Sequence, residues 1–141
     1  MESKQLQVED TLNLEKFIKV FETTYRDVCE ILGEDYTEPE DFLEVDNCIF
    51  LFDSGREHTF SGAVIMSDTY GFFGLKIGAN WLESAGKLES QGFKQAEDLE
   101  RFTKLLPDFS ISVYLYPDDC PDVKLSTVKD YSLSTRYGHA L

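Results

Sequence analysis

The segment at residues 74–93, GLKIGANWLESAGKLESQGF, contains the strongest local folding signal in the sequence. Asn80 stands where a helix N-cap belongs, and Glu83 follows three residues later, which is the capping-box spacing. We predict a helix over residues 81–90. It should end at Gly92, because glycine readily takes the left-handed conformation found at helix C-termini.

A second helical pattern lies at residues 14–32, where apolar side chains recur at steps of three and four. Thr11 or Asn13 can cap its start, and Gly33 can end it. The pattern predicts one helix of about twenty residues with an apolar stripe toward the core. The stripe consists of Leu14, Phe17, Ile18, Phe21, Tyr25, Val28 and Leu32.

Strands are predicted between turn signals rich in Asp, Gly and Pro. Residues 109–116 alternate apolar and polar side chains, which is typical of a strand with one buried and one solvated face. Gly62 marks a bulge or a point of close packing. Residues 94–106 fit either a helix or a strand, ended by Pro107. The other predicted strands are 47–52, 59–66, 72–77 and 123–133, and residues 42–45 form a short strand or a hydrophobic anchor.

One order of elements occurs twice in the chain: helix, glycine, acidic segment, aromatic strand, acidic turn and return strand. We therefore predict an α+β fold, an antiparallel sheet with helices packed on one face, built from two related α+β half-modules. The expected divisions are a lead-in at 1–12, half-modules at 13–71 and 72–135, and a tail at 136–141. The paired segments are 32–36 with 88–93, 40–42 with 97–99, and 50–53 with 114–117.

This order of elements resembles the tandem modules of the beta-lactamase inhibitory protein and of the outer-membrane assembly lipoproteins that share its module. Ile77-Gly78 before the predicted helix, Leu88 near its end and Gly92-Phe93 after it carry the resemblance, which covers about residues 72–133. The chain departs from those families by lacking a signal peptide, a lipid-attachment cysteine and paired disulfide cysteines. The resemblance implies an exposed sheet face and loops that bind other proteins.

The chain carries 27 acidic and 13 basic side chains, a formal charge of −14. Direct nucleic-acid binding is disfavoured, because it needs basic groups that displace counterions. The charge favours an acidic binding or inhibitor protein with a basic protein partner, such as an immunity protein that neutralises a toxin. The candidate partner-binding residues are Glu34, Asp35, Tyr36, Glu38, Glu40, Asp41, Phe42, Glu44, Asp46, Asp118, Asp119 and Asp122.

Three other interpretations stay open. A nucleic-acid mimic would inhibit a DNA- or RNA-binding enzyme with carboxylates laid out at phosphate-like spacing. A small-ligand module or an enzyme would use an aromatic pocket formed by Tyr114, Tyr116, Phe50 and Phe52. The acidic segments could also serve solubility alone.

The sequence contains no motif for a catalytic nucleophile, a zinc site or a phosphate-binding loop. His58 lies in a charged turn and His139 near the last residue, and neither has a metal-ligand spacing. Cys29, Cys48 and Cys120 are far apart and are expected to be reduced. We therefore expect no enzyme activity, no cofactor and no metal.

No apolar run is long enough to cross a bilayer, and the first residues lack the apolar region of a signal peptide. These features predict a cytoplasmic protein without a membrane partner. The oligomeric state is not predicted.

Overall fold

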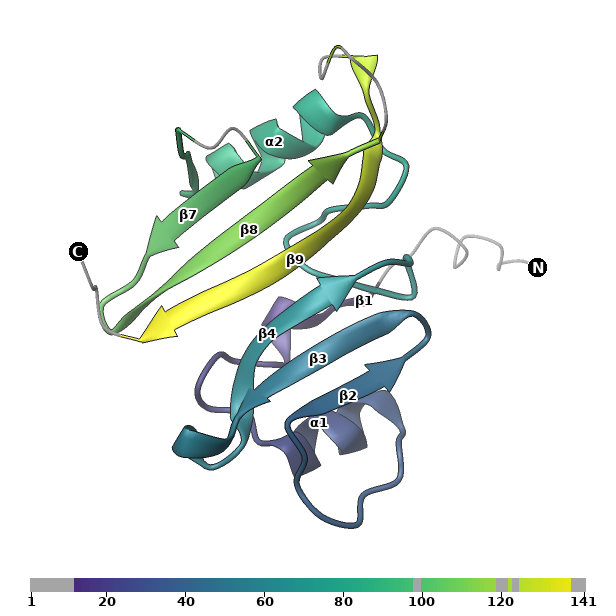
Figure 1. Ribbon diagram of the computed structural model, residues 1–141, viewed down its shortest axis with the longest axis vertical. Helices are drawn as coiled ribbons and strands as arrows, with labels where there is room; N and C mark the ends of the chain where they lie inside the picture. The colour runs from purple at the N-terminus through teal and green to yellow at the C-terminus, as the bar shows by residue number, and fades with distance from the viewer. Residues whose placement is uncertain (1–11, 98–99, 119–121, 123–124, 138–141) are drawn as a thin grey trace.

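The protein is described by a computed structural model that covers residues 12–97, 100–118, 122 and 125–137. Its main element is a seven-stranded antiparallel sheet with the strand order β2-β3-β4-β9-β8-β7-β6 (Figure 1). The strands are β2 (Phe42–Val45), β3 (Cys48–Asp53), β4 (Thr59–Ile65), β6 (Lys94–Gln95), β7 (Arg101–Leu105), β8 (Phe109–Pro117) and β9 (Val128–Tyr137).

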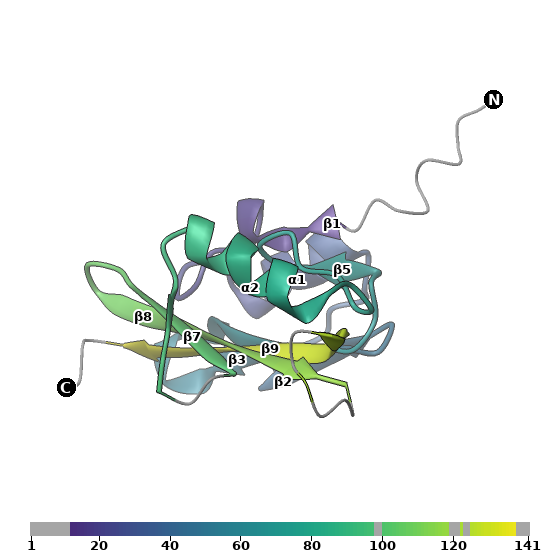
Figure 2. The same ribbon diagram turned by 90° about the horizontal axis from the view of Figure 1, so that it is seen from above.

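Two helices, α1 (Tyr25–Leu32) and α2 (Trp81–Ser90), cover one face of this sheet (Figure 2). The predicted α+β class, with an antiparallel sheet and helices on one face, is confirmed. A small parallel pair, β1 (Leu12–Asn13) and β5 (Tyr70–Gly71), lies on the same side as the helices. None of the helices in the described part of the chain has the length and apolar character that a membrane crossing requires.

Helix α2 forms where the capping signal predicts it. The Asn80 side chain accepts a hydrogen bond from the backbone N–H of Glu83 at 2.8 Å. At the other end, the N–H of Phe93 donates to the Leu88 carbonyl at 3.1 Å, and Gly92 has a φ of +98°. The buried face of the helix consists of Trp81, Ser84, Ala85 and Leu88.

The single helix predicted over residues 14–32 is wrong. A short 3-10 helix (Leu14–Lys16) and helix α1 replace it, and Thr24 caps α1 by accepting the Asp27 N–H at 3.2 Å. Between them, Phe21 takes a φ of +61° and donates its backbone N–H to the carbonyl of Phe60 at 2.8 Å. Hydrogen bonding to β4 therefore overrides the local helical pattern.

The strand predicted over residues 72–77 is also wrong. Side chains hold this segment as a loop: the Phe72 N–H donates to the Tyr131 hydroxyl at 3.0 Å, and the Phe73 N–H to Glu15 at 2.9 Å. Gly74 has a φ of +76°, which no regular strand accommodates. The backbone donors that a strand needs for pairing are already used.

Residues 94–106, left open between helix and strand, contain the strands β6 and β7. Residues 98 and 99 of this segment lie outside the described part. The return strand begins at residue 128 and extends to 137, so Arg136 and Tyr137 pair with Ser110 and Phe109 instead of forming a tail. Leu12 of the predicted lead-in pairs with Tyr70. Residues 1–11 and 138–141 lie outside the description.

The two halves of the structure repeat one set of hydrogen bonds. The N–H of Tyr25, the first residue of α1, donates to His58 at 2.8 Å, and the N–H of Trp81, the first residue of α2, donates to Ser126 at 2.9 Å. Returning bonds of 2.8 Å run from Phe60 to the Thr23 carbonyl and from Val128 to the Ala79 carbonyl. Each helix is thus joined to the start of its own return strand in the same way.

The repeat includes an irregularity in each return strand. Ser61 has no partner in β3, because Leu51 pairs with Gly62 and Phe52 with Phe60. Lys129 likewise has no partner in β8, because Tyr116 pairs with Asp130 and Pro117 with Val128. When the two bulges are superposed, Phe50 is equivalent to Leu115. The match expected from the sequence, Phe50 with Tyr114, is therefore displaced by one residue. The common origin of the halves stays a prediction.

Candidate functional site

The side of the sheet away from the helices, which we call the open face, is not covered by any described element (Figure 2). Strand pairing places alternate side chains on it, so the row Ile49, Val64, Ser132, Tyr114 and Arg101 crosses five strands. The adjacent row that faces the helices, Phe50, Ala63, Leu133, Val113 and Phe102, is buried. Besides its first row, the open face contains Phe42, Glu44, Leu51, Asp53, Ser134, Ser110, Ser112, Tyr116, Thr103, Leu105, Lys94, Arg136 and Asp130.

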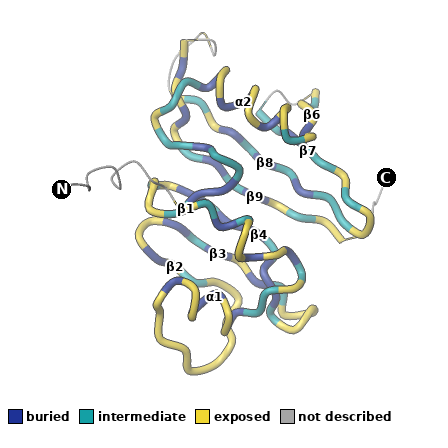
Figure 3. Tube along the Cα trace, turned by 180° about the vertical axis from the view of Figure 1, so that it is seen from behind, coloured by how far each residue is buried: buried dark blue, intermediate teal, exposed yellow. Residues whose placement is uncertain are grey.

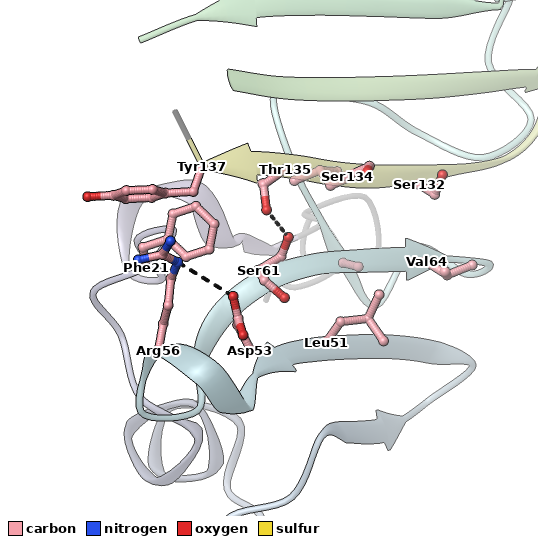
Figure 4. A pocket seen from close by; sticks show the side chains of 12 residues that line it. Phe21, Leu51, Asp53, Arg56, Ser61, Val64, Ser132, Ser134, Thr135 and Tyr137 are labelled. Atoms are coloured by element: carbon pink, nitrogen blue, oxygen red, sulfur yellow. Dashed lines mark hydrogen bonds and ion pairs between the residues drawn. The ribbon is translucent and has the colours of Figure 1, made fainter. Parts of the chain in front are cut away.

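Two adjoining hollows open on this face, and the larger one reaches between β4 and β9 to Ala63 and Leu133 of the row that faces the helices. One, of about 500 Å³, lies between β3–β4 and β9 (Figure 4). The other, of about 320 Å³, lies over β7, β8 and β9. They share Ser134 and Thr135. Small side chains and the bulge at Ser61 create this space, because β4 and β9 pair only over four residues each.

The larger hollow is closed at one end by Arg56. Its guanidinium carbon lies 3.6 Å from the ring centroid of Tyr137 and 5.4 Å from that of Phe21. Its Nε also lies 3.6 Å from the Asp53 carboxylate (Figure 4). Nearby, the Thr135 hydroxyl donates to the Ser61 carbonyl. This end of the hollow is therefore fixed by contacts within the chain.

The open face is nearly neutral, in contrast to the chain as a whole. Its charged residues within the strands are Glu44, Asp53 and Asp130 against Lys94, Arg101 and Arg136, and neither arginine makes an ion pair within the described ranges. The rings of Tyr114 and Tyr116 stack with their centroids 6.3 Å apart. Large apolar side chains lie at its margins, since Phe42 is 54% exposed and Leu105 is 64% exposed.

The predicted partner-binding residues fall into two separate regions. Those at residues 34–46 lie in the connection from α1 to β2, in β2 itself and in the following turn, and every residue from 33 to 42 is exposed (Figure 3). Asp118 and Asp122 lie at the β8–β9 connection, at the opposite end of the long axis (Figure 1). Asp119 lies outside the described residues. The acidic groups therefore do not form one site.

Tyr36 and Phe42, the two aromatic residues of the acidic segment, differ in their surroundings. The Tyr36 ring packs against Tyr25 at a centroid distance of 6.0 Å, and the Arg26 guanidinium lies 5.5 Å above it. Phe42 lies on the open face opposite Leu51. Among these acids, Asp41 lies 3.8 Å from the Nε2 of His58.

The aromatic pocket considered from the sequence does not form. Tyr114 and Tyr116 lie on the open face, whereas Phe50 and Phe52 point toward the helices and are buried. The sheet itself separates the two pairs, because residues that pair across neighbouring strands share a face: Tyr114 lies in the row of Ile49, and Phe50 in the row of Val113.

The strongest pKa changes belong to buried groups of the core. Burial, followed by the neighbouring Cys29 thiol, raises the pKa of Tyr25 to about 12. Burial also raises the pKa of Cys29 and that of Tyr131. In the part of the chain that the structure describes, no three His, Cys, Asp or Glu side chains are placed to hold a metal ion. The arrangement on the open face is suited to binding through rings, hydroxyls and guanidiniums.

Sequence reasoning missed the centre of the open face. The alternation in residues 109–116 identified Ser112 and Tyr114 as solvated, but Ser134 and Leu51 carry no comparable signal. Strand order brings them together. Searches with this chain against protein-family models, curated proteins and solved structures returned no match.

Proposed function

We propose that this chain is a binding protein that holds a basic protein partner on the open face, with acidic groups at both ends of the long axis as the rim. The observation that carries the proposal is the contrast between a nearly neutral, uncovered sheet face and a chain of charge −14. The proposal keeps the expectation of an inhibitor or immunity protein and assigns its contact surface.

The composition of the open face supports this function. Interface centres are depleted of charged residues and enriched in aromatic residues and arginine. Tyr114, Tyr116, Arg101 and Arg136 are of these types. Serine hydroxyls beside tyrosine rings, as at Ser112 and Ser134, also resemble the composition of antibody paratopes, where they provide adaptable hydrogen bonds.

The acidic ends support the choice of a basic partner. Charges at the rim of an interface increase the association rate and add less to the affinity than buried contacts do. The exposed acids of residues 34–46 and the pair Asp118 and Asp122 flank the open face at its two ends. A basic surface that approaches from the open side is attracted by both.

A cytoplasmic setting is part of the proposal. Cys29 and Cys48 are buried free thiols, which suits a reducing compartment. The resemblance to tandem inhibitory modules points in the same direction, since it implies protein binding through a sheet face. A toxin neutralised by its immunity protein is the kind of partner that we expect.

The test uses a matched pair of substitutions. Ser134 is exposed at the junction of the two hollows, and Ser90 is exposed at the end of α2 on the other side. Proteins captured by the wild-type chain from a lysate of its own organism are purified and titrated against wild type, Ser134→Arg and Ser90→Arg. We expect Ser134→Arg to weaken binding at least about tenfold, or roughly 1.4 kcal/mol, and Ser90→Arg to leave it unchanged.

The dependence of the binding rates on salt concentration is the second measurement in the same experiment. Raising the ionic strength should slow association more than it accelerates dissociation, because rim charges act mainly during encounter. If Ser134→Arg and wild type bind the partner with equal affinity, the open face is not the binding surface. If the association rate does not change with salt concentration, the acidic ends do not attract the partner during encounter.

A further inference from the structure

The two halves of the protein differ in whether a further strand pairs with their outer strand, β7 in the second half and β2 in the first. In the second half, the segment that follows α2 returns as β6 and pairs with β7. In the first half, the segment that follows α1 runs away from the sheet as an exposed loop, and β2 is the last strand on that side (Figures 1 and 3). The repeat thus contains one edge position that is filled and an equivalent one that is vacant among the described residues.

The pairing register identifies which backbone groups face the vacant position. The N–H of Phe52 donates to the Asp41 carbonyl at 2.8 Å, so Asp41, and with it Leu43 and Val45, direct their backbone groups toward β3. The N–H and C=O groups of the alternate residues, Phe42 and Glu44, therefore face outward.

The filled edge shows how such a position is used. Arg101 pairs with Tyr114 in β8 as Glu44 pairs with Ile49 in β3, so Arg101 and Glu44 are equivalent. The Arg101 carbonyl accepts a hydrogen bond from Ala96 at 2.8 Å, next to the antiparallel β6–β7 pairing. The equivalent carbonyl of Glu44 faces the vacant edge.

We propose that an extended, basic segment of the partner protein adds to the edge of β2 as an eighth, antiparallel strand. The inference rests on the proposed function, because the same basic partner supplies this segment. Strand addition uses backbone hydrogen bonds for affinity and alternate side chains for selectivity. The alternate side chains at this edge include Phe42, which provides an apolar contact, and Glu44, which selects a positive charge.

Charge decides between a partner segment and a second copy of this chain. No Lys or Arg occurs from residue 34 to residue 46, and Glu40, Asp41, Glu44 and Asp46 lie along or beside β2. Two copies joined at β2 would bring these acids together, and like charges placed opposite each other destabilise strand pairing. A segment rich in Lys or Arg removes the repulsion.

The β2 edge contains no lysine, proline or bulge, three of the features by which proteins protect such edges. Exposed edges are commonly blocked by lysine, proline or a bulge within the strand. The sequence of β2 is Phe-Leu-Glu-Val, and its pairing with β3 is regular over all four residues. The opposite edge strand, β6, contains Lys94 and has only two residues.

The experiment separates the backbone of Glu44 from its charge. Glu44→Pro removes the outward N–H and is compatible with an edge strand, where proline is tolerated. Glu44→Gln removes the charge and keeps the N–H. The probe is a peptide of about eight residues, within the usual strand length, that alternates Lys and Val. A peptide residue directly opposite Glu44 shares its face and directs its own N–H toward β2, so the lysines supply the bonding N–H groups. Two control peptides have N-methylated lysines, or Glu in place of Lys.

Amide hydrogen exchange of the intact chain reports the contact directly. With the Lys–Val peptide at saturation, we expect exchange of the Phe42 and Glu44 amides to slow by about tenfold or more, and both control peptides to have no effect. Glu44→Gln should weaken peptide binding a few-fold, and Glu44→Pro should abolish it while the fold, checked by the amide spectrum, is retained. Slowed exchange that depends on protein concentration without peptide would indicate a second copy and overturn the proposal.

The purified partner distinguishes this inference from the proposed function. If Glu44→Pro binds the partner as wild type does while Ser134→Arg does not, strand addition is wrong and binding by the open face stands. If Glu44→Pro loses the partner and Ser134→Arg keeps it, the edge is the binding site and the open face is not. An absence of peptide-dependent protection at Phe42 and Glu44 overturns strand addition.

Discussion

The α-carbon of Gly62 in β4 lies against the backbone carbonyl of Leu133 in β9: a Cβ at this position would be 2.8 Å from the carbonyl oxygen. Gly62 is also the first residue of β4 that pairs with β9, opposite Ser134. The close approach confirms the expected close packing at Gly62, and the bulge predicted there lies at the adjacent Ser61.

Gly62→Ala should therefore destabilise the protein. The methyl group forces β4 and β9 apart, and we expect the free energy of unfolding to fall by about 1–3 kcal/mol, as for other overpacked sites. Gly86→Ala is the control, because a Cβ there meets nothing within 4 Å on the exposed side of α2. It should increase stability by about 0.5–1 kcal/mol. Urea denaturation of both variants checks the prediction. Equal changes in the free energy of unfolding for the two variants would contradict it.

The two helix caps should contribute alike. Thr24→Ala and Asn80→Ala each remove a side chain that accepts a backbone N–H in the first turn, from Asp27 at 3.2 Å and from Glu83 at 2.8 Å. We expect each substitution to cost about 1 kcal/mol. Because the caps belong to separate helices, the double variant should show the sum within about 0.5 kcal/mol. Thermal unfolding of the three variants measures this, and strong non-additivity would argue against independent caps.

The hydroxyl of Tyr131 should stabilise the loop at residues 72–77. It accepts the buried N–H of Phe72 at 3.0 Å, and Tyr131→Phe leaves that donor without a partner. The expected loss in the free energy of unfolding is about 1–3 kcal/mol. Tyr116→Phe, at an exposed ring, serves as the control and should change stability little. If the two substitutions have the same effect, the Tyr131–Phe72 bond contributes nothing.

Alkaline pH should unfold the protein through its buried tyrosines. Burial raises the pKa of Tyr25 from 10.0 to about 12, and it raises that of Tyr131 as well. The unfolded chain releases these protons first, so the stabilisation is complete below pH 10.0 and is lost as the pH rises toward 12. For Tyr25 the loss amounts to about 2–3 kcal/mol.

Tyr25→Phe tests this assignment. The variant should show a smaller decrease in stability between pH 10.0 and pH 12 than wild type, measured by urea denaturation at each pH. An unchanged slope would mean that Tyr25 ionises equally easily in the folded and unfolded chain.

Local chemistry made α2 predictable from the sequence, whereas tertiary contacts decided the segments that were predicted wrongly. Asn80 and Glu83 are neighbours along the chain, and their cap needs no other part of the protein. Phe21 has the right spacing for a helix, but its hydrogen bond to Phe60 in β4 ends that pattern. No local signal reports a partner so far away in the sequence.

The same distinction applies to the candidate site. Alternation identified the solvated side of β8, which carries Ser112 and Tyr114. The place of β9 between β4 and β8 decides that Ser134 and Leu51 extend this surface, and it also places the two acidic regions at opposite ends. The sequence therefore indicates which residue types belong to the candidate surface, but not which of them lie side by side.

The position of β9 has a consequence for how the molecule is assembled. β9 follows the other six strands of the sheet in the sequence, yet it lies between β4 and β8, and among the described strands it alone joins the two halves of this sheet. During synthesis, β4 and β8 each present an open edge until β9 emerges from the ribosome. We therefore expect nascent chains of this protein to pass through a stage with two partial sheets, each with an unpaired strand edge. At this stage a chaperone would be most useful, because unpaired edges favour aggregation.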